Sequence, residues 1–570
     1  PTHAHGQGYL DLNLLIPEVI DYVDYRKGPY YADIGDFSSA GGASIRTYRR
    51  LPYGIVKIGV GENDYLRGLA ADSRPLGRGH LMYAFDSEYA NGPWTNPDHF
   101  RKFTGLLRYS NGDTDSGSDL TLLGYSGTWN STDQIPRRAV DDGRLDRLAA
   151  EDPSDGGETQ RLIASGRFWS EGEKTKDEAT AFVQYYRLNL WSNFTYFLDD
   201  PVHGDQFEQQ DKRVIAGTNA EHKIDSTLFG SESEDAFGIQ LRHDYIPTVA
   251  LRHTEERRVL STVSDDRVNE SAGGVYWRNT TKWLPKFRTT LGLRGDGYLF
   301  DVHSDQPGNS GFAKDGIVSP KLTMVFGPWA STEFYLNGGT GFHSNDARGT
   351  TIRQDPKTGA PVDRVSPLVR SKGAEVGART SAVPNLQSTV SVWILDLDSE
   401  LLFTGDAGTT EASRPSRRNG VEWSNYWKPT NWLSVDADLS LTHAEFTDSD
   451  PAGSRIPGSL SRVIESGIEA GRSQGLTGSF RVRHFSGRPL IEDNSVRSNA
   501  STLCNLQVGY ATKRSLSFSL DVLNVFNSPD HDIDYYYASR LAGEPAGGVN
   551  DIHFHPAEPR AVRAYVTERF

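Results

Sequence analysis

The chain has 570 residues, of which 36% are hydrophobic and 11% aromatic, and its mean hydropathy is −0.55. This composition is poor in aliphatic residues for a soluble chain of such length, and it suits a large barrel with a polar interior and one apolar outer band. The formal net charge of −15 and the lack of a basic stripe exclude a nucleic-acid partner.

Neither a membrane-spanning helix nor cysteine chemistry is expected. No run of about 18 apolar residues occurs, and Cys504 is the single cysteine, which excludes an internal disulfide and any cysteine-based metal cluster. Gly-x-Ser-x-Gly does not occur in a strand-to-helix setting, and no phosphate-binding loop is found. We therefore predict that the chain is not an enzyme and that it needs no cofactor.

The first fifty residues differ from the rest of the chain. Leu14–Val23 reads as a short helix or turn that runs into a strand, and a Gly/Ser/Ala-rich stretch follows. The chain starts at Pro1 in mid-motif, with neither Met nor a signal peptide, so we expect a fragment or a processed piece. We predict that this region is a compact, mixed structure and a candidate plug remnant.

From residue 51 onward the sequence repeats β-hairpins. In Leu433–Leu441 apolar residues alternate with Ser and Asp, which is the period-two pattern of a strand with one apolar and one polar face. Counting such runs predicts an all-β fold, a 22-stranded antiparallel transmembrane barrel that is wide enough to need a plug. The 22 runs begin near residues 53, 64, 79, 101, 118, 158, 178, 213, 234, 269, 287, 317, 331, 366, 386, 419, 432, 460, 476, 500, 515 and 558.

The connections between these strands alternate in length. Short connections carry turn residues beside Trp and Tyr, as in 427–432, whereas long ones are polar, as in 131–157, 246–268 and 527–556. Short turns at one end, long loops at the other and an aromatic girdle are typical of an outer-membrane barrel rather than of a soluble sandwich. A short helix is expected inside one long loop, at 145–150.

Several motifs, in this order and spacing, resemble a TonB-dependent outer-membrane receptor along essentially the whole chain. Ile16-Pro17-Glu18 followed by Val23–Pro29 resembles the end of the family's plug, and Gly41–Thr47 resembles the strand that leads into its barrel. Matches near the C-terminus are Leu523–Asn527, similar to the "NLFN" run of the penultimate strand, and Glu558-Pro559-Arg560 with Phe570, similar to the last strand.

This resemblance implies active import. The family binds a ligand from outside, and the inner-membrane TonB complex pulls on the plug to release the ligand inward. By this resemblance residues 1–50 are the C-terminal part of the plug domain and residues 51–570 are the barrel. It also implies a monomer in the bacterial outer membrane, in contact with lipid and lipopolysaccharide. A siderophore or other iron chelate is the commonest ligand class, and carbohydrates, other metal chelates and cobalamin are the alternatives.

Two features depart from the family's pattern. The first part of the plug and the TonB box, through which the family meets TonB, are absent from these residues. In the last strand, Glu568 stands where an apolar residue should face outward. A lipid-facing Glu near the interface costs little compared with one at the midplane, but it weakens the signal for barrel assembly.

Residues near the N-terminus are the first candidate site. His3, His5, Gln7 and Tyr9 lie where the family's plug loops face the ligand, and Gly residues separate some of them. Two imidazoles, an amide and a phenol suit a chelate or an oxygen-rich ligand. The alternative is a tight turn, permitted by Gly6 and Gly8, whose polar groups bond the barrel wall.

The last long loop is the second candidate site. Its residues with ligand-binding side chains are His531, Asp534, Tyr536, Arg540, His553 and His555. His553 and His555 share a strand face because positions i and i+2 point together, and with His531 or an Asp they suit a transition metal. The spacing is not that of a known metal motif, so no metal site is predicted. The alternative is a packed loop in which His, Asp and Arg bond one another.

Two other function classes remain open at this point. A passive pore would lack the plug-like region at Leu14–Thr47, and its conductance would not depend on that region. A soluble all-β adhesin or enzyme would not require detergent for extraction. Charged residues on inward strand faces, such as Glu375, Glu422 and Asp436, are expected to be wall residues that bond a plug.

Overall fold

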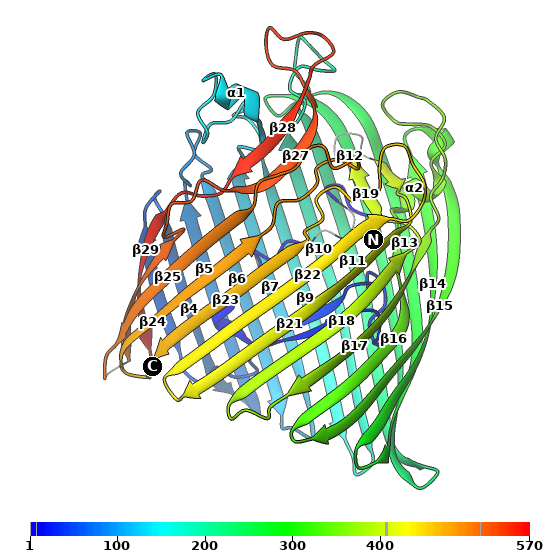
Figure 1. Ribbon diagram of the computed structural model, residues 1–570, viewed down its shortest axis with the longest axis vertical. Helices are drawn as coiled ribbons and strands as arrows, with labels where there is room; N and C mark the ends of the chain where they lie inside the picture. Colours follow the sequence, from blue (N-terminus) through cyan, green and yellow to red (C-terminus); the bar gives the residue numbers. More distant parts are fainter. Residues whose placement is uncertain (1, 7, 9, 405–408, 514) are drawn as a thin grey trace.

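The structure is a computed structural model that describes residues 2–6, 8, 10–404, 409–513 and 515–570, without the side chains of 401–404 and 409–412. Its main feature is a closed barrel in which β29 pairs with β3 (Figure 1). The barrel strands are β3 (Ile55–Gly61), β4 (Leu66–Leu76), β5 (Gly79–Ala90), β6 (Phe100–Gly112), β7 (Ser116–Asn130), β9 (Gly156–Glu171), β10 (Thr175–Ser192), β11 (Phe207–Leu228), β12 (Ser231–Glu255), β13 (Arg258–Leu284), β14 (Phe287–Ser304), β15 (Gly311–Trp329), β16 (Thr332–Ser344), β17 (Leu368–Thr380), β18 (Leu386–Leu397), β21 (Ser416–Thr430), β22 (Leu433–Phe446), β23 (Arg462–Gly471), β24 (Gly475–Phe485), β25 (Ser501–Ala511), β26 (Leu516–Leu523) and β29 (Ala561–Arg569).

The remaining elements lie inside the barrel or at its mouth. They are η1 (Pro17–Val19), β1 (Ile20–Lys27), β2 (Gly41–Thr47), β8 (Ile135–Pro136), α1 (Arg137–Asp141), η2 (Pro307–Asn309), α2 (Ala347–Thr351), β19 (Leu401–Thr404), β20 (Thr409–Ala412), β27 (His531–Ser539) and β28 (Val549–Pro556). In the described part of the chain, no helix has the length and apolar character needed to cross a membrane.

The predicted 22-stranded antiparallel barrel is confirmed, and each predicted run corresponds to one barrel strand. The expected long connection at 246–268 is wrong, because β12 and β13 continue as one hairpin around a turn at Glu256 and Arg257. The ends of these two strands lie beyond the apolar band, where the outer face of a strand need not be apolar. Their polar sequence therefore resembles that of a loop. The expected helix at 145–150 is also wrong, since the helix of that loop is α1.

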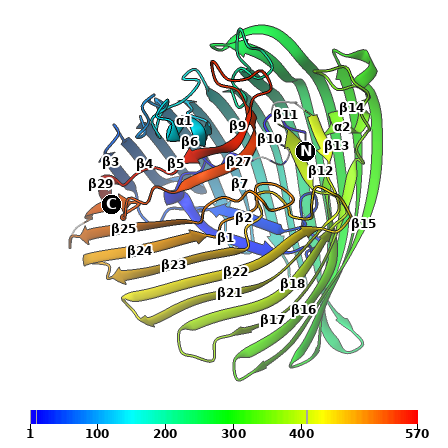
Figure 2. The ribbon, with the colours of Figure 1, turned by 45° about the horizontal axis from the view of Figure 1, so that its top comes forward.

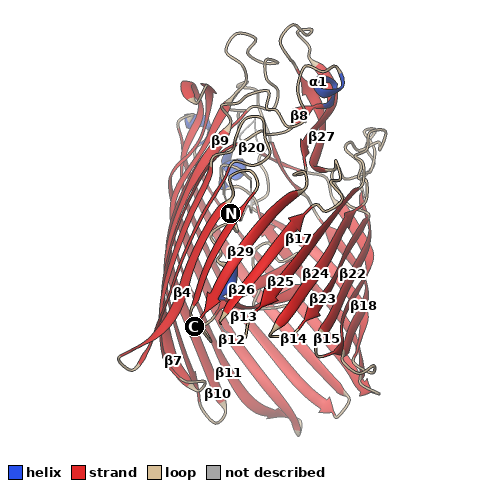
Figure 3. Cartoon of the chain, turned by 90° about the vertical axis from the view of Figure 1, so that its left-hand side faces the viewer, coloured by secondary structure: helices blue, strands red, loops and turns tan. Residues whose placement is uncertain are grey.

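Side chains alternate across the wall as the sequence predicts. Val508, Tyr510, Phe518 and Leu520 are exposed on the outer face, and Cys504 has the same parity as Val508 but is buried. Long loops gather at one end of the barrel and short turns at the other (Figure 3). The aromatic residues beside the short turns that are exposed include Trp329, Trp423, Tyr426, Trp427 and Trp432. This arrangement forms an outer apolar band with an aromatic border.

The N-terminal segment is residues 2–50, and its described part, all but residues 7 and 9, lies within the barrel. Its strands β1 and β2 pair as an antiparallel hairpin that crosses the lumen (Figure 2). Next to the hairpin, Ile16 and Val19 are buried in an apolar cluster with wall residues that include Leu69 and Met82. This cluster gives the segment one apolar attachment to β4 and β5.

Candidate functional site in the lumen and at the mouth

A buried ion-pair network joins the N-terminal segment to the wall on the side of β3 to β6. Both carboxylate oxygens of Glu18 accept hydrogen bonds from Arg67, at 2.9 and 2.8 Å, and Lys57 donates to Glu18 at 3.1 Å. Arg67 also donates to Asp86 at 2.8 Å, and Lys102 lies 3.1 Å from the second oxygen of Asp86. The half-buried Glu18 and the fully buried Asp86 therefore share one guanidinium that bridges segment and wall.

Polar contacts attach the segment to the opposite wall as well. Lys321 donates to the main-chain carbonyl of Pro29 at 2.9 Å, and Arg294 donates to that of Ala32 at 3.2 Å. The hydroxyl of Ser344 donates to Asp36 at 2.6 Å, and Glu422 forms an ion pair with Lys27. The inward residue Glu422 thus forms the predicted contact with the segment. All these polar contacts can break without disrupting the main-chain hydrogen bonds between the barrel strands.

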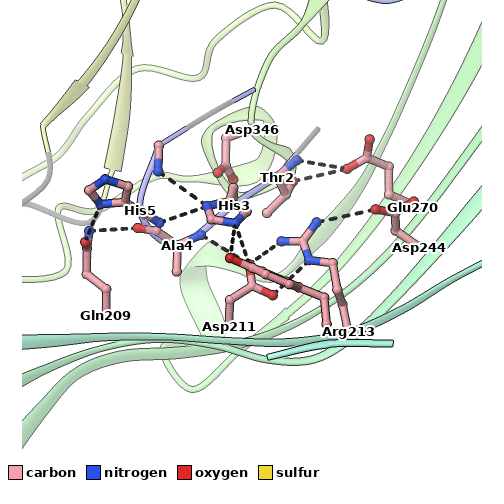
Figure 4. A network of polar contacts seen from close by, with 12 residues as sticks. Thr2, His3, Ala4, His5, Gln209, Asp211, Arg213, Asp244, Glu270 and Asp346 are labelled. Atoms are coloured by element: carbon pink, nitrogen blue, oxygen red, sulfur yellow. Dashed lines mark hydrogen bonds and ion pairs between the residues drawn. The ribbon is translucent and has the colours of Figure 1, made fainter. Parts of the chain in front are cut away.

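His3 and His5 lie under the mouth of the barrel and are bonded to the wall (Figure 4). His3 is only 8% exposed; its Nε2 lies 3.2 Å from the hydroxyl of Tyr186 and 3.9 Å from a carboxylate oxygen of Asp211. His5 Nδ1 lies 3.3 Å from the side-chain oxygen of Gln209. Burial lowers the pKa of His3 to about 3 and also lowers that of His5. Both imidazoles are therefore neutral at pH 7.

A loop between β16 and β17 covers this N-terminal end. The main-chain N–H of Ala347 donates to Thr2 at 2.8 Å, and Arg348 donates to the carbonyl of His3 at 3.2 Å while it pairs with Asp346 at 2.8 Å. Gln7 and Tyr9, the other predicted residues, lie outside the described residues. Ligand contact by His3 and His5 stays a prediction, which requires this loop to move.

The second candidate site forms a small sheet above the barrel mouth, in which β28 pairs with β27 and with β8. His553 is fully buried and stacks on Tyr537, with ring centroids 3.8 Å apart. Its Nδ1 lies 3.1 Å from the carbonyl of Asp551 and its Nε2 lies 2.7 Å from the hydroxyl of Ser539. Because a carbonyl only accepts, Nδ1 carries the proton of the neutral ring and Nε2 accepts from Ser539.

The other predicted residues of this loop each have a separate neighbour. His531 stacks on Phe554 and lies 2.7 Å from Asp534, which in turn faces Arg488 at 3.8 Å. Tyr536 is half-buried opposite Ile552 in the β27–β28 ladder. Arg540 donates to the carbonyls of Phe197 and Glu544, and His555 packs on Trp94 with centroids 4.9 Å apart. The described residues contain no group of three side chains arranged to hold a metal ion.

Sequence reasoning missed Arg138, which joins two loops in this sheet. Its guanidinium donates to both oxygens of Glu544 at 2.8 Å and to the carbonyl and hydroxyl of Ser539 at 3.0 Å. Arg138 holds the pKa of Glu544 down at about 2. The loop that contains α1 and the last long loop therefore form one packed unit, and only the pairing of their strands could have indicated it.

Acidification from pH 6.5 to pH 4 is expected to loosen the β27–β28 sheet. Burial lowers the pKa of His553 to about 4 from an ordinary value of 6.5, so the opened loop takes up a proton before the packed loop does. The sheet keeps its full stability above pH 6.5 and loses up to about 3 kcal/mol by pH 4. Hydrogen exchange of the β27–β28 amides, corrected for intrinsic rates, measures this loss.

Two variants test the assignment of this pH dependence. His553→Gln should reduce it and leave only the part due to His555, whose pKa burial also lowers. His203→Gln, which changes an exposed loop histidine, should retain all of it. An unchanged pH dependence in His553→Gln would contradict the assignment.

Two lumenal cavities border the N-terminal segment. One of about 180 Å³ lies between Asp36 and the wall, where Arg242, Asp244 and Glu270 line it. Another of about 540 Å³ lies against the β1–β2 hairpin. Its charged and aromatic lining residues are Tyr25, Arg26, Lys27, Tyr30, Tyr31, Arg278, Tyr335, Glu375 and Arg379. Guanidinium groups and phenols together suit an anionic, oxygen-rich ligand.

Comparison with known proteins agrees with this architecture. A model of the TonB dependent receptor-like β-barrel family matches residues 59–525, while no curated protein matches the chain. The unliganded ferric citrate transporter FecA is similar, with 15% identity and a TM-score of 0.80 over 100% of this chain and 86% of that chain. The ferric yersiniabactin uptake receptor FyuA from Yersinia pestis has 14% identity and a TM-score of 0.77 over 96% and 85% of the two chains.

Another protein of similar structure is named as a transporter of a different metal. The copper transporter OprC has 15% identity and a TM-score of 0.75, over 98% of this chain and 87% of that chain. At such identities these likenesses show the fold alone. The family model, however, spans well over half of the chain and agrees with the closed barrel. The chain therefore belongs to the family of TonB-dependent receptors of the bacterial outer membrane.

Proposed function

We propose that this protein imports a ferric chelate, of the siderophore class or similar, by TonB-dependent active transport. The observation that carries the proposal is the lumenal segment, which crosses the barrel and is fastened to both walls by polar contacts. In this proposal residues 2–50 are the final part of a plug whose remaining part carries the contact with TonB. We also propose that the receptor is a monomer and that lipid and lipopolysaccharide surround its barrel.

The choice of a ferric chelate rests on two supports. Proteins of similar fold transport ferric citrate and take up ferric yersiniabactin. In addition, the larger cavity beside the hairpin, on its short-turn side, combines guanidinium groups with phenols, which suit the carboxylate or phenolate oxygens of an iron chelate that leaves the barrel. The copper transporter of similar fold supports a second candidate, a chelate of another metal. A carbohydrate is the remaining candidate for an oxygen-rich ligand.

Uptake of labelled chelates by cells tests the proposal. Cells with the receptor as their only route should take up at least one of ⁵⁵Fe-citrate or a ⁵⁵Fe-catecholate, and this uptake should cease in an otherwise identical strain without TonB. Parallel cultures with labelled copper chelates and oligosaccharides identify the alternative cargoes. Uptake that persists without TonB would instead show a passive pore.

A further inference from the structure

A row of charged residues crosses the outer face of the barrel at its loop end. In the strand pairing Lys372 of β17 lies opposite Asp396 of β18, Asp396 lies opposite Arg417 of β21, and Arg417 lies opposite Glu445 of β22. Directly opposed residues share one face of a sheet. We name these four residues and their neighbours Arg370, His443, Arg455 and Arg462 the outer charged row.

The direction of this row follows from the alternation of the strands. In each of these strands, the residue four positions from the charged residue, toward the short turns, is apolar and exposed, and it points to the same face of the sheet as the charged residue. These apolar residues are Val376, Val392, Val421 and Leu441. The outer charged row therefore faces outward and lies at the border where the apolar band ends, on the side of the long loops.

Cations dominate the row although the whole chain carries a net charge of −15. Arg370 has the same parity as Lys372, Arg462 lies opposite the outward Leu441, and Arg455 forms a β-bridge with Glu445. Of the nearby carboxylates, Asp396 accepts from Arg417 at 2.7 and 3.0 Å, and Glu445 lies 3.2 Å from His443. The exposed Asp398 lies opposite Arg370, and the five Lys and Arg residues still outnumber these three acids. The row thus presents positive charge to its surroundings.

A pocket of about 200 Å³ lies beside the row, between the loops that follow β22 and β24. Arg455, Arg497, His443 and Asn494 line it together with hydroxyl groups that include Ser461. Arg455 Nη1 lies 3.5 Å from His443 Nδ1. Among the described residues that line the pocket there is no carboxylate. Guanidinium, hydroxyl and amide donors without a competing acid are suited to a phosphate group.

We propose that the outer charged row and its pocket bind the phosphate groups of a phosphorylated glycolipid in the outer leaflet, with its acyl chains along the apolar band. The occupant must have an anionic head at the level of the cations and apolar chains directly beside it, because the two surfaces are continuous. A lipid satisfies both conditions, whereas a soluble anion satisfies only the first. The site is separate from the lumen and does not depend on the imported ligand.

Lipid binding by the purified protein in detergent tests this site. Native mass spectrometry would follow titration with bisphosphorylated lipid A, with the same lipid after removal of its phosphates, and with inorganic phosphate as competitor. The triple variant Arg417→Ala/Arg455→Ala/Arg462→Ala should bind bisphosphorylated lipid A on the order of 10- to 100-fold more weakly than the wild type. The dephosphorylated lipid should bind both proteins equally weakly.

A matched variant controls for the loss of three positive charges. Arg74→Ala/Arg78→Ala/Arg258→Ala removes three exposed arginines in or next to β4 and at the start of β13, outside the strands of the row, and it should bind lipid A like the wild type. The single variant Arg462→Glu, at a position whose side chain is exposed, should also bind more weakly and guards against misfolding of the triple variant. Folding of each barrel is checked by its heat-dependent migration on gels.

Four results would overturn the proposal. They are unchanged binding in both row variants, an equal loss in the matched variant, equal binding of the dephosphorylated lipid to the wild type, and displacement of lipid A by inorganic phosphate at equal concentration. The last result would assign the pocket to a free anion.

Discussion

Removal of residues 2–50, together with any chain expressed ahead of them, is expected to convert a closed barrel into an open pore. The wall closes on itself through β29 and β3 and does not use the segment for its hydrogen-bond ladder. The segment crosses the lumen and occupies it with the β1–β2 hairpin. A barrel of 22 strands has a lumen wide enough to conduct ions once it is empty.

Single-channel recording in planar bilayers measures this effect. The intact protein should be closed or show rare openings, and the deletion variant should show a large and steady conductance. Gel migration before and after heating confirms that both barrels are folded. Steady conductance of equal size in both proteins would mean an ordinary pore and would refute the plug interpretation of the segment.

The barrel could be predicted because its strands carry a strong local signal. In β22 every outward position from Leu433 to Leu441 is apolar and every inward one is Ser or Asp, so period two is visible without any tertiary information. The signal fails where a strand leaves the apolar band. In β12 residues 252–255, and in β13 residues 264–267, are polar on both faces, yet they stay paired because main-chain hydrogen bonds between strands do not depend on side-chain polarity.

The candidate site could be predicted only in part, because its contacts join residues distant in sequence. His3 and His5 were singled out by residue type, but their partners Tyr186, Gln209 and Asp211 lie about 200 positions away. No local pattern places those side chains together. The alternating inward polar residues of the strands indicate a polar wall, but which of them meets the N-terminal segment depends on barrel closure.

The Arg67→Ala variant is expected to loosen the N-terminal segment from the wall by about 2 to 3 kcal/mol. Removal of one partner from a buried ion pair generally costs about 3 to 5 kcal/mol, because a charge remains buried without compensation. Here Lys57 and Lys102 stay close to Glu18 and Asp86, and they reduce the loss. Hydrogen exchange of the η1 and β1 amides and the frequency of channel openings should both rise.

Another ion pair between segment and wall provides the matched control. Arg46 lies 3.7 Å from Glu178, but the Arg46 side chain is 43% exposed. Solvent screens such a pair, so Arg46→Ala should change the exchange of the hairpin by less than about 1 kcal/mol. The effect of Arg67→Lys on exchange should lie between those of Arg46→Ala and Arg67→Ala. An ammonium group keeps the positive charge, but it lacks the planar guanidinium that donates to both Glu18 oxygens. Equal effects of Arg46→Ala and Arg67→Ala would contradict the assignment of Arg67 as a stronger attachment than Arg46.

The same network predicts how acid affects the attachment. Burial by itself raises the pKa of Glu18, but the hydrogen bonds and charge of Arg67, together with Lys57, outweigh it and lower that pKa below its ordinary value of 4.5. The contribution of Glu18 is therefore fully present above pH 4.5 and is lost as the pH falls through its lowered value. In Arg67→Ala this acid-dependent loss should shrink, because the main cause of the lowered pKa has gone and less stabilisation remains to be lost. A segment that is fastened to the walls by separable side-chain contacts such as that of Arg67 would let a pulling force detach it while the barrel stays closed on itself.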